Sequence, residues 1–117
     1  MSALPLREQQ IRQCARRAID AIKWFGWAQG DEVGVEDVLV GPCCATTATD
    51  RAEAIDDLPE ETSYFVDERL ARILNLPLPE KDGWNIAVAT WNDDPARTEA
   101  DVVAALQRVA DGEGTAL

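Results

Sequence analysis

The sequence of 117 residues contains no histidine and only three cysteines, Cys14, Cys43 and Cys44. Without an imidazole side chain, the Ser–His and Cys–His pairs of nucleophilic enzymes and the histidine ligands of zinc and haem are excluded. An odd number of cysteines without a Cys-x-x-Cys spacing argues against a disulfide framework and a zinc knuckle. We therefore expect no metal site, no cofactor and no catalytic residue, and catalysis is the less favoured interpretation.

The sequence also lacks any long apolar run. No stretch approaches the roughly 20 apolar residues that a membrane-spanning helix needs. The short segment Met1–Leu6 is followed by charged residues, not by the apolar core of a signal peptide. We therefore expect a cytoplasmic protein without membrane association. Its length and its 46% of hydrophobic residues predict a single globular domain over residues 1–117.

Basic residues are scarce, with 11 Lys and Arg against 22 Asp and Glu, so the net charge is −11. Residues 31–117 hold six basic and twenty acidic residues, whereas residues 1–30 hold five basic and two acidic ones. A polyanionic surface repels nucleic-acid phosphates and attracts basic protein surfaces, so we predict a basic protein partner and no direct nucleic-acid binding. Alternatively, the acidic residues only keep a small domain soluble. The predicted acidic face comprises Asp50, Glu53, Asp56, Asp57, Glu60 and Glu61.

Apolar residues recur every three or four positions in the first half of the chain, which predicts helices. The first predicted helix runs from Pro5 to about Ala28, and Gly30 is expected to end it. A second helix is expected to begin at Pro42. Its apolar side would consist of Cys44 or Ala45, Ala48, Ala52 and Ile55. Between these two helices, residues 33–40 predict either a short β-hairpin or an irregular loop.

The second half of the chain predicts further helices. One runs from about Glu61 to Asn75 and ends before a Leu-Pro-Leu-Pro sequence. Residues 84–91 fit both a helix and a strand, and we favour a short helix. The sequence Thr98-Glu99-Ala100-Asp101 resembles a capping box that opens the last helix, and residues 112–117 are expected to fray. The fold class is therefore mainly α, with four to five helices.

Two groups of aromatic and polar residues are candidate binding sites. Trp91, Asn92, Asp93 and Arg97 are crowded around one turn, where they could lock the entry to the last helix or form a ligand pocket. Trp24 and Trp27 end the first predicted helix, and we expect one of them to be partly exposed as an interface anchor. The candidate binding residues are Trp91, Asn92, Asp93, Arg97 and Trp27.

Three blocks of residues carry a resemblance to a known family. They are Gly26-Trp27-Ala28-Gln29-Gly30, Cys44-Ala45, and Trp91-Asn92-Asp93 followed by Pro95, Arg97 and Thr98. The chain resembles a family of small uncharacterised proteins of actinobacteria and their phages, over roughly residues 11–110. It departs from the family pattern with Ala96 in place of glycine and with Thr46-Thr47 in place of a Leu-Gly pair. The resemblance implies an actinobacterial or phage origin and supplies no reaction.

Two functional hypotheses follow. The first is a small acidic intracellular protein, phage-encoded if the resemblance holds, that acts as an interaction or inhibitory module by occupying a basic surface on a partner. The second is a small-ligand binding protein or minimal enzyme with its site at the turn of Trp91, Asn92, Asp93 and Arg97. The first requires an exposed acidic face, whereas the second requires a hollow beside that turn.

Overall fold

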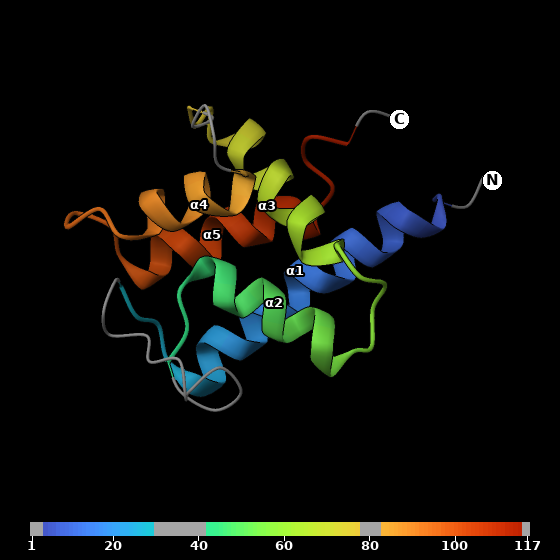
Figure 1. Ribbon diagram of the computed structural model, residues 1–117, viewed down its shortest axis with the longest axis horizontal. Helices are drawn as coiled ribbons and strands as arrows, with labels where there is room; N and C mark the ends of the chain where they lie inside the picture. The colour runs from blue at the N-terminus through green and yellow to red at the C-terminus, as the bar shows by residue number, and fades with distance from the viewer. Residues whose placement is uncertain (1–3, 30–41, 78–82, 116–117) are drawn as a thin grey trace.

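The computed structural model describes residues 4–29, 42–77 and 83–115 of the chain, and these form five helices (Figure 1). The mainly α fold predicted from the sequence is confirmed. Among the described residues, extended pairing is limited to one isolated bridge between Trp27 and Cys43. The hairpin considered for residues 33–40 lies outside the described residues. The helices are α1 Leu6–Phe25, α2 Ala45–Ile55, α3 Thr62–Ile73, α4 Trp84–Asn92 and α5 Glu99–Ala110.

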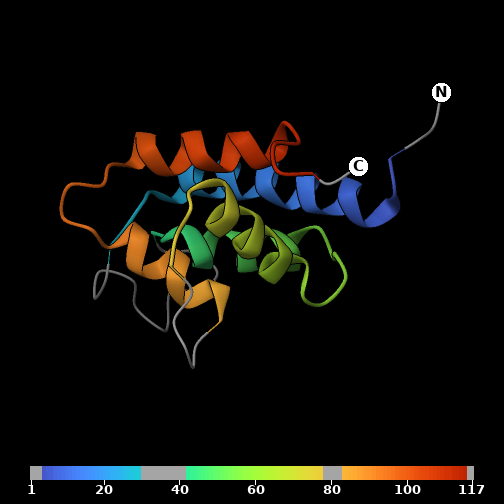
Figure 2. The ribbon, with the colours of Figure 1, turned by 90° about the horizontal axis from the view of Figure 1, so that it is seen from above.

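The helices form two layers around a shared core. Helices α1 and α5 lie side by side, and α2, α3 and α4 pack beneath them (Figure 2). The longest helix, α1, contacts α2, α3 and α5, so its apolar face forms the centre of the core. Ile22, Leu70 and Leu106 are almost completely buried there, and each such side chain contributes roughly 1.5–3 kcal/mol relative to exposure.

Helix α1 ends at Phe25, earlier than predicted, because Gly26 and not Gly30 stops it. Gly26 adopts a φ of 97°, which favours glycine, and its N–H donates to the carbonyl of Ile22. The chain then turns away and runs beside Cys43. Ala28 N–H donates to the Cys43 carbonyl at 3.1 Å, and Cys43 N–H donates to the Gly26 carbonyl at 2.9 Å. This pairing with Cys43 explains why the helix ends at Gly26, the first of the two glycines.

Helix α2 begins at Ala45, three residues after the predicted start. Cys44 is its N-cap, and the Cys44 Sγ accepts a hydrogen bond from the backbone N–H of Thr47 at 3.5 Å. The predicted alanines are buried and allow α1 and α2 to approach closely. The prediction that Ile55 lines the same side is wrong, because this side chain is 55% exposed at the end of the helix.

The remaining helices follow the predictions closely. Helix α3 lies within the predicted range, and α4 confirms the helical interpretation of residues 84–91. The capping box at the start of α5 is also confirmed. The Thr98 hydroxyl accepts from Asp101 N–H at 3.2 Å, and the Asp101 carboxylate accepts from Thr98 N–H at 3.0 Å. These reciprocal bonds satisfy two backbone donors that the helix leaves unpaired.

Residues 112–115, the described part of the segment 112–117 that the sequence predicts to fray, lie against the helices. The Thr115 hydroxyl donates to the carboxylate of Glu8 at 2.8 Å. Arg69 and Arg12 donate to the same carboxylate at 2.8 Å each. Burial raises the pKa of Glu8, but these hydrogen bonds outweigh burial and lower it to about 2. Glu8 therefore joins α1, α3 and the segment after α5.

Candidate functional site

Asn92, the last residue of α4, is completely buried and joins three segments. Its Oδ1 accepts from the indole N–H of Trp27 at 2.7 Å and from the backbone N–H of Ala45 at 3.0 Å. Its Nδ2 donates to the Ala28 carbonyl at 3.1 Å and to the Asp93 carboxylate at 3.2 Å. Trp27, which the sequence placed in a separate group, therefore comes together with Asn92 and Asp93, and Asn92 is fully occupied within the protein.

Gln29 strengthens the same junction and was missed as a candidate site residue. Its side-chain amide donates to the Asn92 carbonyl at 2.9 Å and to the Asp94 carbonyl at 2.7 Å. These carbonyls lie at the end of α4, where a helix leaves backbone acceptors unpaired. The only sequence signal for this role is the position of Gln29 in the block Gly-Trp-x-Gln-Gly.

Trp91 and Arg97 form a separate pair on the outer side of the turn. The Arg97 guanidinium lies 4.2 Å from the centre of the Trp91 ring, a cation–π geometry. Its Nε donates to the Trp91 carbonyl at 3.0 Å, and Asp94 lies 3.9 Å away. A hollow of about 290 Å³ adjoins this pair. Its lining is formed by Leu76, Pro77, Ala87, Thr90, Trp91, Asp94 and Arg97.

Two residues of the predicted acidic face make hydrogen bonds within the fold. Glu53 accepts a hydrogen bond from the backbone N–H of Ser63 at 2.9 Å, which satisfies a donor at the start of α3. Asp56 accepts from Arg17 at 3.0 Å and from Gln13 at 3.0 Å, so it ties the end of α2 to α1. These two carboxylates serve the fold.

The other four acidic candidates are exposed. Asp50 lies on α2 close to Ser63, whereas Asp57, Glu60 and Glu61 follow α2 in the turn that leads to α3. We call these last three residues the acidic turn. No ion pair joins any of the three to another residue within the described parts of the chain. Their charges are therefore free to act on a partner.

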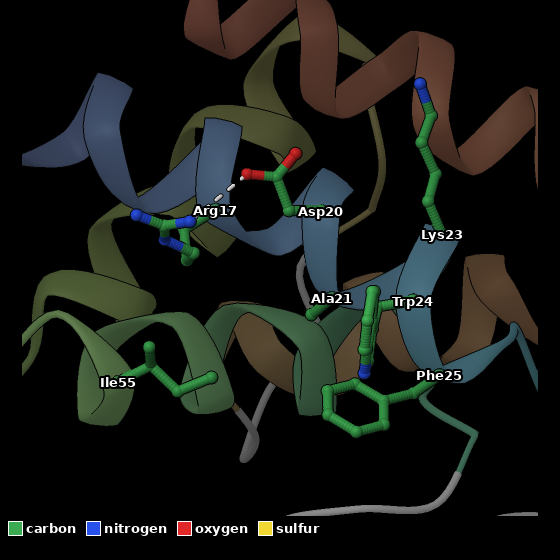
Figure 3. A pocket seen from close by; sticks show the side chains of 7 residues that line it. All are labelled: Arg17, Asp20, Ala21, Lys23, Trp24, Phe25 and Ile55. Atoms are coloured by element: carbon green, nitrogen blue, oxygen red, sulfur yellow. Dashed lines mark hydrogen bonds and ion pairs between the residues drawn. The ribbon is translucent and has the colours of Figure 1, made fainter.

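A second hollow lies between the end of α1 and the end of α2 (Figure 3). Its volume is about 480 Å³. Trp24 is 83% exposed and stands beside Phe25, with Ile55 across the hollow on α2. The sequence flagged Trp24 as one of two possible anchors, but it gave no sign that Ile55 would face it. The hollow, which we call the Trp24 groove, is lined by Arg17, Asp20, Ala21, Lys23, Trp24, Phe25 and Ile55.

A comparison with protein-family models places this chain. The model described as a family of unknown function (DUF6197) matches residues 6–112, which extend from the first residue of α1 to just beyond α5. The chain belongs to DUF6197. Comparisons with curated proteins and with solved structures found no match. Membership in DUF6197 agrees with the resemblance to an uncharacterised domain, and the family carries no assigned activity.

The cysteines of this DUF6197 chain are all free, and their exposure differs. Cys14 and Cys43 are completely buried, and burial raises the pKa of both thiols, that of Cys43 to about 11. Cys44 is half-buried at the start of α2, where its Sγ lies 3.3 Å from the hydroxyls of Thr46 and Thr47. The two buried thiols are poor nucleophiles because the thiolate is the reactive form.

No group of three or more Cys, Asp or Glu residues within the described ranges is placed to hold a metal ion. None of the helices described for the chain is long and apolar enough to cross a membrane.

Proposed function

We propose that the protein is a small interaction module that acts in the cytoplasm and occupies a positively charged surface of another protein. Such occupancy is inhibitory where the covered surface serves another ligand, including a nucleic acid. The observation that carries the proposal is the net charge of −11 together with the unpaired, exposed acidic turn of Asp57, Glu60 and Glu61. Opposite charges steer association and suppress partners of like charge.

Affinity capture from host lysate at low and at moderate salt tests this proposal. We expect one dominant basic protein, identified by mass spectrometry, whose retention falls as salt screens the charges. The variant Asp57→Asn/Glu60→Gln/Glu61→Gln should retain less of this protein. The control Glu99→Gln/Asp111→Asn/Glu113→Gln changes the net charge equally at and beside α5 and should retain it. Equal retention by both variants, or no enriched basic protein, would contradict the proposal.

The second candidate function is the binding of a small ligand beside Trp91 and Arg97. The hollow of about 290 Å³ favours it, since Arg97 is held there by its stack on Trp91 and could face a negatively charged group. Asn92 is buried and is hydrogen-bonded to Trp27 and Ala45. Asn92 and Trp27 therefore support the turn and do not contact the ligand in this second candidate function. In a thermal-shift screen of small carboxylates, a compound that binds beside Arg97 should raise the melting temperature of the wild type and not that of Arg97→Gln.

A further inference from the structure

We propose that the Trp24 groove receives an apolar side chain from a positively charged segment of the partner protein. This inference rests on the proposed function, and it names the contact that the acidic surface alone does not supply. Long-range attraction steers two proteins together, but affinity comes mainly from a few buried anchors. The groove is a place on the described surface where such an anchor can be buried.

Two exposed side chains give the groove most of its apolar character. Trp24 is 83% exposed and Ile55 is 55% exposed, and they face each other across the hollow (Figure 3). Ala21 and Phe25 complete the apolar lining between them. Large apolar side chains gathered at a concave surface typify interaction sites, and tryptophan is among the most frequent interface anchors. A side chain inserted between Trp24 and Ile55 would remove both from water.

Phe25 and Arg17, two residues of the groove lining, are held in place by contacts within the protein. Arg51 is 1% exposed, and its guanidinium lies 4.6 Å from the centre of the Phe25 ring. On the opposite side, the Arg17 guanidinium donates to Asp56 at 3.0 Å and to Asp20 at 3.4 Å. These contacts fix both ends of the lining. Binding to a preformed site loses less conformational entropy than binding to one that must be ordered.

Carboxylates offset the cationic residues at the groove, and the net charge of −11 of the whole protein favours a cationic segment. Asp20 and Asp56 neutralise Arg17, and Asp57, the first residue of the acidic turn, follows shortly after Ile55 in the chain. Lys23 also lines the groove, and its side chain extends away from Phe25 (Figure 3). The exposed indole face of Trp24 itself attracts Lys or Arg through a cation–π contact.

A second copy of the same chain is the less favoured occupant. Each copy has a net charge of −11, so two copies repel one another. A basic segment gains from both the field of the whole protein and the carboxylates near the groove. The charge balance therefore selects a different, positively charged protein.

Selection from a library of short random peptides on the folded full-length chain tests the inference. Enriched peptides should combine one aromatic or branched aliphatic residue with Lys or Arg. Labelled copies of these peptides should bind Trp24→Ala and Ile55→Ser at least about tenfold more weakly than the wild type, as expected for loss of an anchor. Leu6→Ala is the matched control, since Leu6 is 68% exposed on the same helix but far from the groove.

The indole N–H signals of the tryptophans report the position of the bound peptide. The Trp24 signal should shift on titration, whereas the Trp27 signal, whose N–H is bonded to Asn92, should stay in place. Acrylamide should quench the Trp24 fluorescence of the free protein. Protection from acrylamide in the monomer would show that the chain itself covers the groove, and a loss of self-association in Trp24→Ala would identify a second copy as the occupant. Either result overturns the inference.

The remaining outcomes separate the inference from the proposed function. Cationic peptides could bind Trp24→Ala as tightly as the wild type and bind less tightly when the acidic turn is neutralised. This result would overturn the assignment of the groove as the binding site and leave the proposed function standing. Enriched peptides with a net negative charge, or the absence of any enriched peptide, would overturn the groove assignment. Peptide binding through Trp24 without a basic partner in lysate would instead contradict the proposed function.

Discussion

The hydroxyl group of Thr49 lies 3.1 Å from the carboxylate of Asp67 and 2.9 Å from the carbonyl oxygen of Thr46. A hydroxyl has one proton, so it cannot donate to both oxygens at once. Both hydrogen bonds form together when Asp67 is protonated and donates to Thr49. Burial raises the pKa of Asp67 well above its usual range, and the nearby charge of Asp50 raises it further.

Replacement of Asp67 by asparagine should make stability less dependent on pH. Because the pKa of Asp67 is raised on folding, its contribution is fully present below the unfolded pKa of about 4 and is lost as pH rises through the folded pKa. An amide stays neutral and keeps a donor for Thr49. We therefore expect the stability of Asp67→Asn relative to the wild type to increase with pH.

Urea unfolding at several pH values, followed by circular dichroism, measures this change. The control Asp57→Asn removes an exposed carboxylate from the acidic turn and should give a curve nearly parallel to that of the wild type. If the free energy of unfolding of Asp67→Asn also changed with pH in parallel with that of the wild type, Asp67 would be ionised in the folded protein.

The buried carboxylate of Glu8 predicts the opposite dependence on pH. Although burial raises its pKa, the hydrogen bonds from Arg69, Arg12 and Thr115 lower it to about 2. Its contribution to stability is therefore present above the unfolded pKa of about 4 and is lost as pH falls toward 2. Glu8→Gln should lower the free energy of unfolding by about 3 kcal/mol at neutral pH, because it leaves buried Arg69 without a counter-charge.

Denaturant unfolding at neutral and at acidic pH tests the role of Glu8. The difference between Glu8→Gln and the wild type should shrink as pH falls. Glu60→Gln, at an exposed position, is the control and should change stability by no more than a few tenths of a kcal/mol. A similarly small loss for Glu8→Gln would show that the network does not stabilise the fold.

Much of the helical architecture could be predicted from apolar periodicity and caps. The stripe on α1, the range of α3 and the capping box at Thr98 follow from local rules, which the tertiary structure respects. The end of α1 could not be predicted, because Gly26 and Gly30 are equivalent as local stop signals. The pairing of residues 26–28 with Cys43, seventeen positions away from Gly26, decides between them.

The candidate site was only partly accessible to sequence reasoning. Polar residues around Trp91 and Arg97 marked a turn, yet whether Asn92 is buried depends on Trp27 and Ala45, which are distant in the chain. The Trp24 groove needs Ile55 from another helix, and periodicity placed Ile55 on the buried side. Periodicity identifies the average inward direction of a helix and not where its neighbour ends.

The junction at Asn92 predicts a large effect from a small substitution. Asn92→Ala leaves Trp27 N–H and Ala45 N–H without their acceptor in the protein interior. Each unsatisfied buried group costs roughly 1–3 kcal/mol, so we expect a loss of about 3 kcal/mol. Urea unfolding measures the loss, and the indole signal of Trp27 should move as its hydrogen bond disappears.

The exposed residue Asn85, on the same helix as Asn92, provides the control. Asn85→Ala should leave both the stability and the Trp27 signal nearly unchanged, because it removes no buried hydrogen bond. If Asn92→Ala were as stable as this control, the hydrogen bonds of Asn92 would contribute nothing to the fold.

The three cysteines should react with a thiol reagent at different rates. Cys14 and Cys43 are completely buried, and burial raises the pKa of Cys43 from 9.0 to about 11, which lowers its thiolate fraction at neutral pH by about 100-fold. Cys44 is half-buried at the start of α2.

We expect a disulfide reagent to label one thiol quickly in the folded protein and three in urea. Cys44→Ser should abolish the fast phase while keeping the helix capped, since serine is a favourable N-cap residue. A fast phase that survives this substitution would mean that α1 or the segment around Cys43 opens readily.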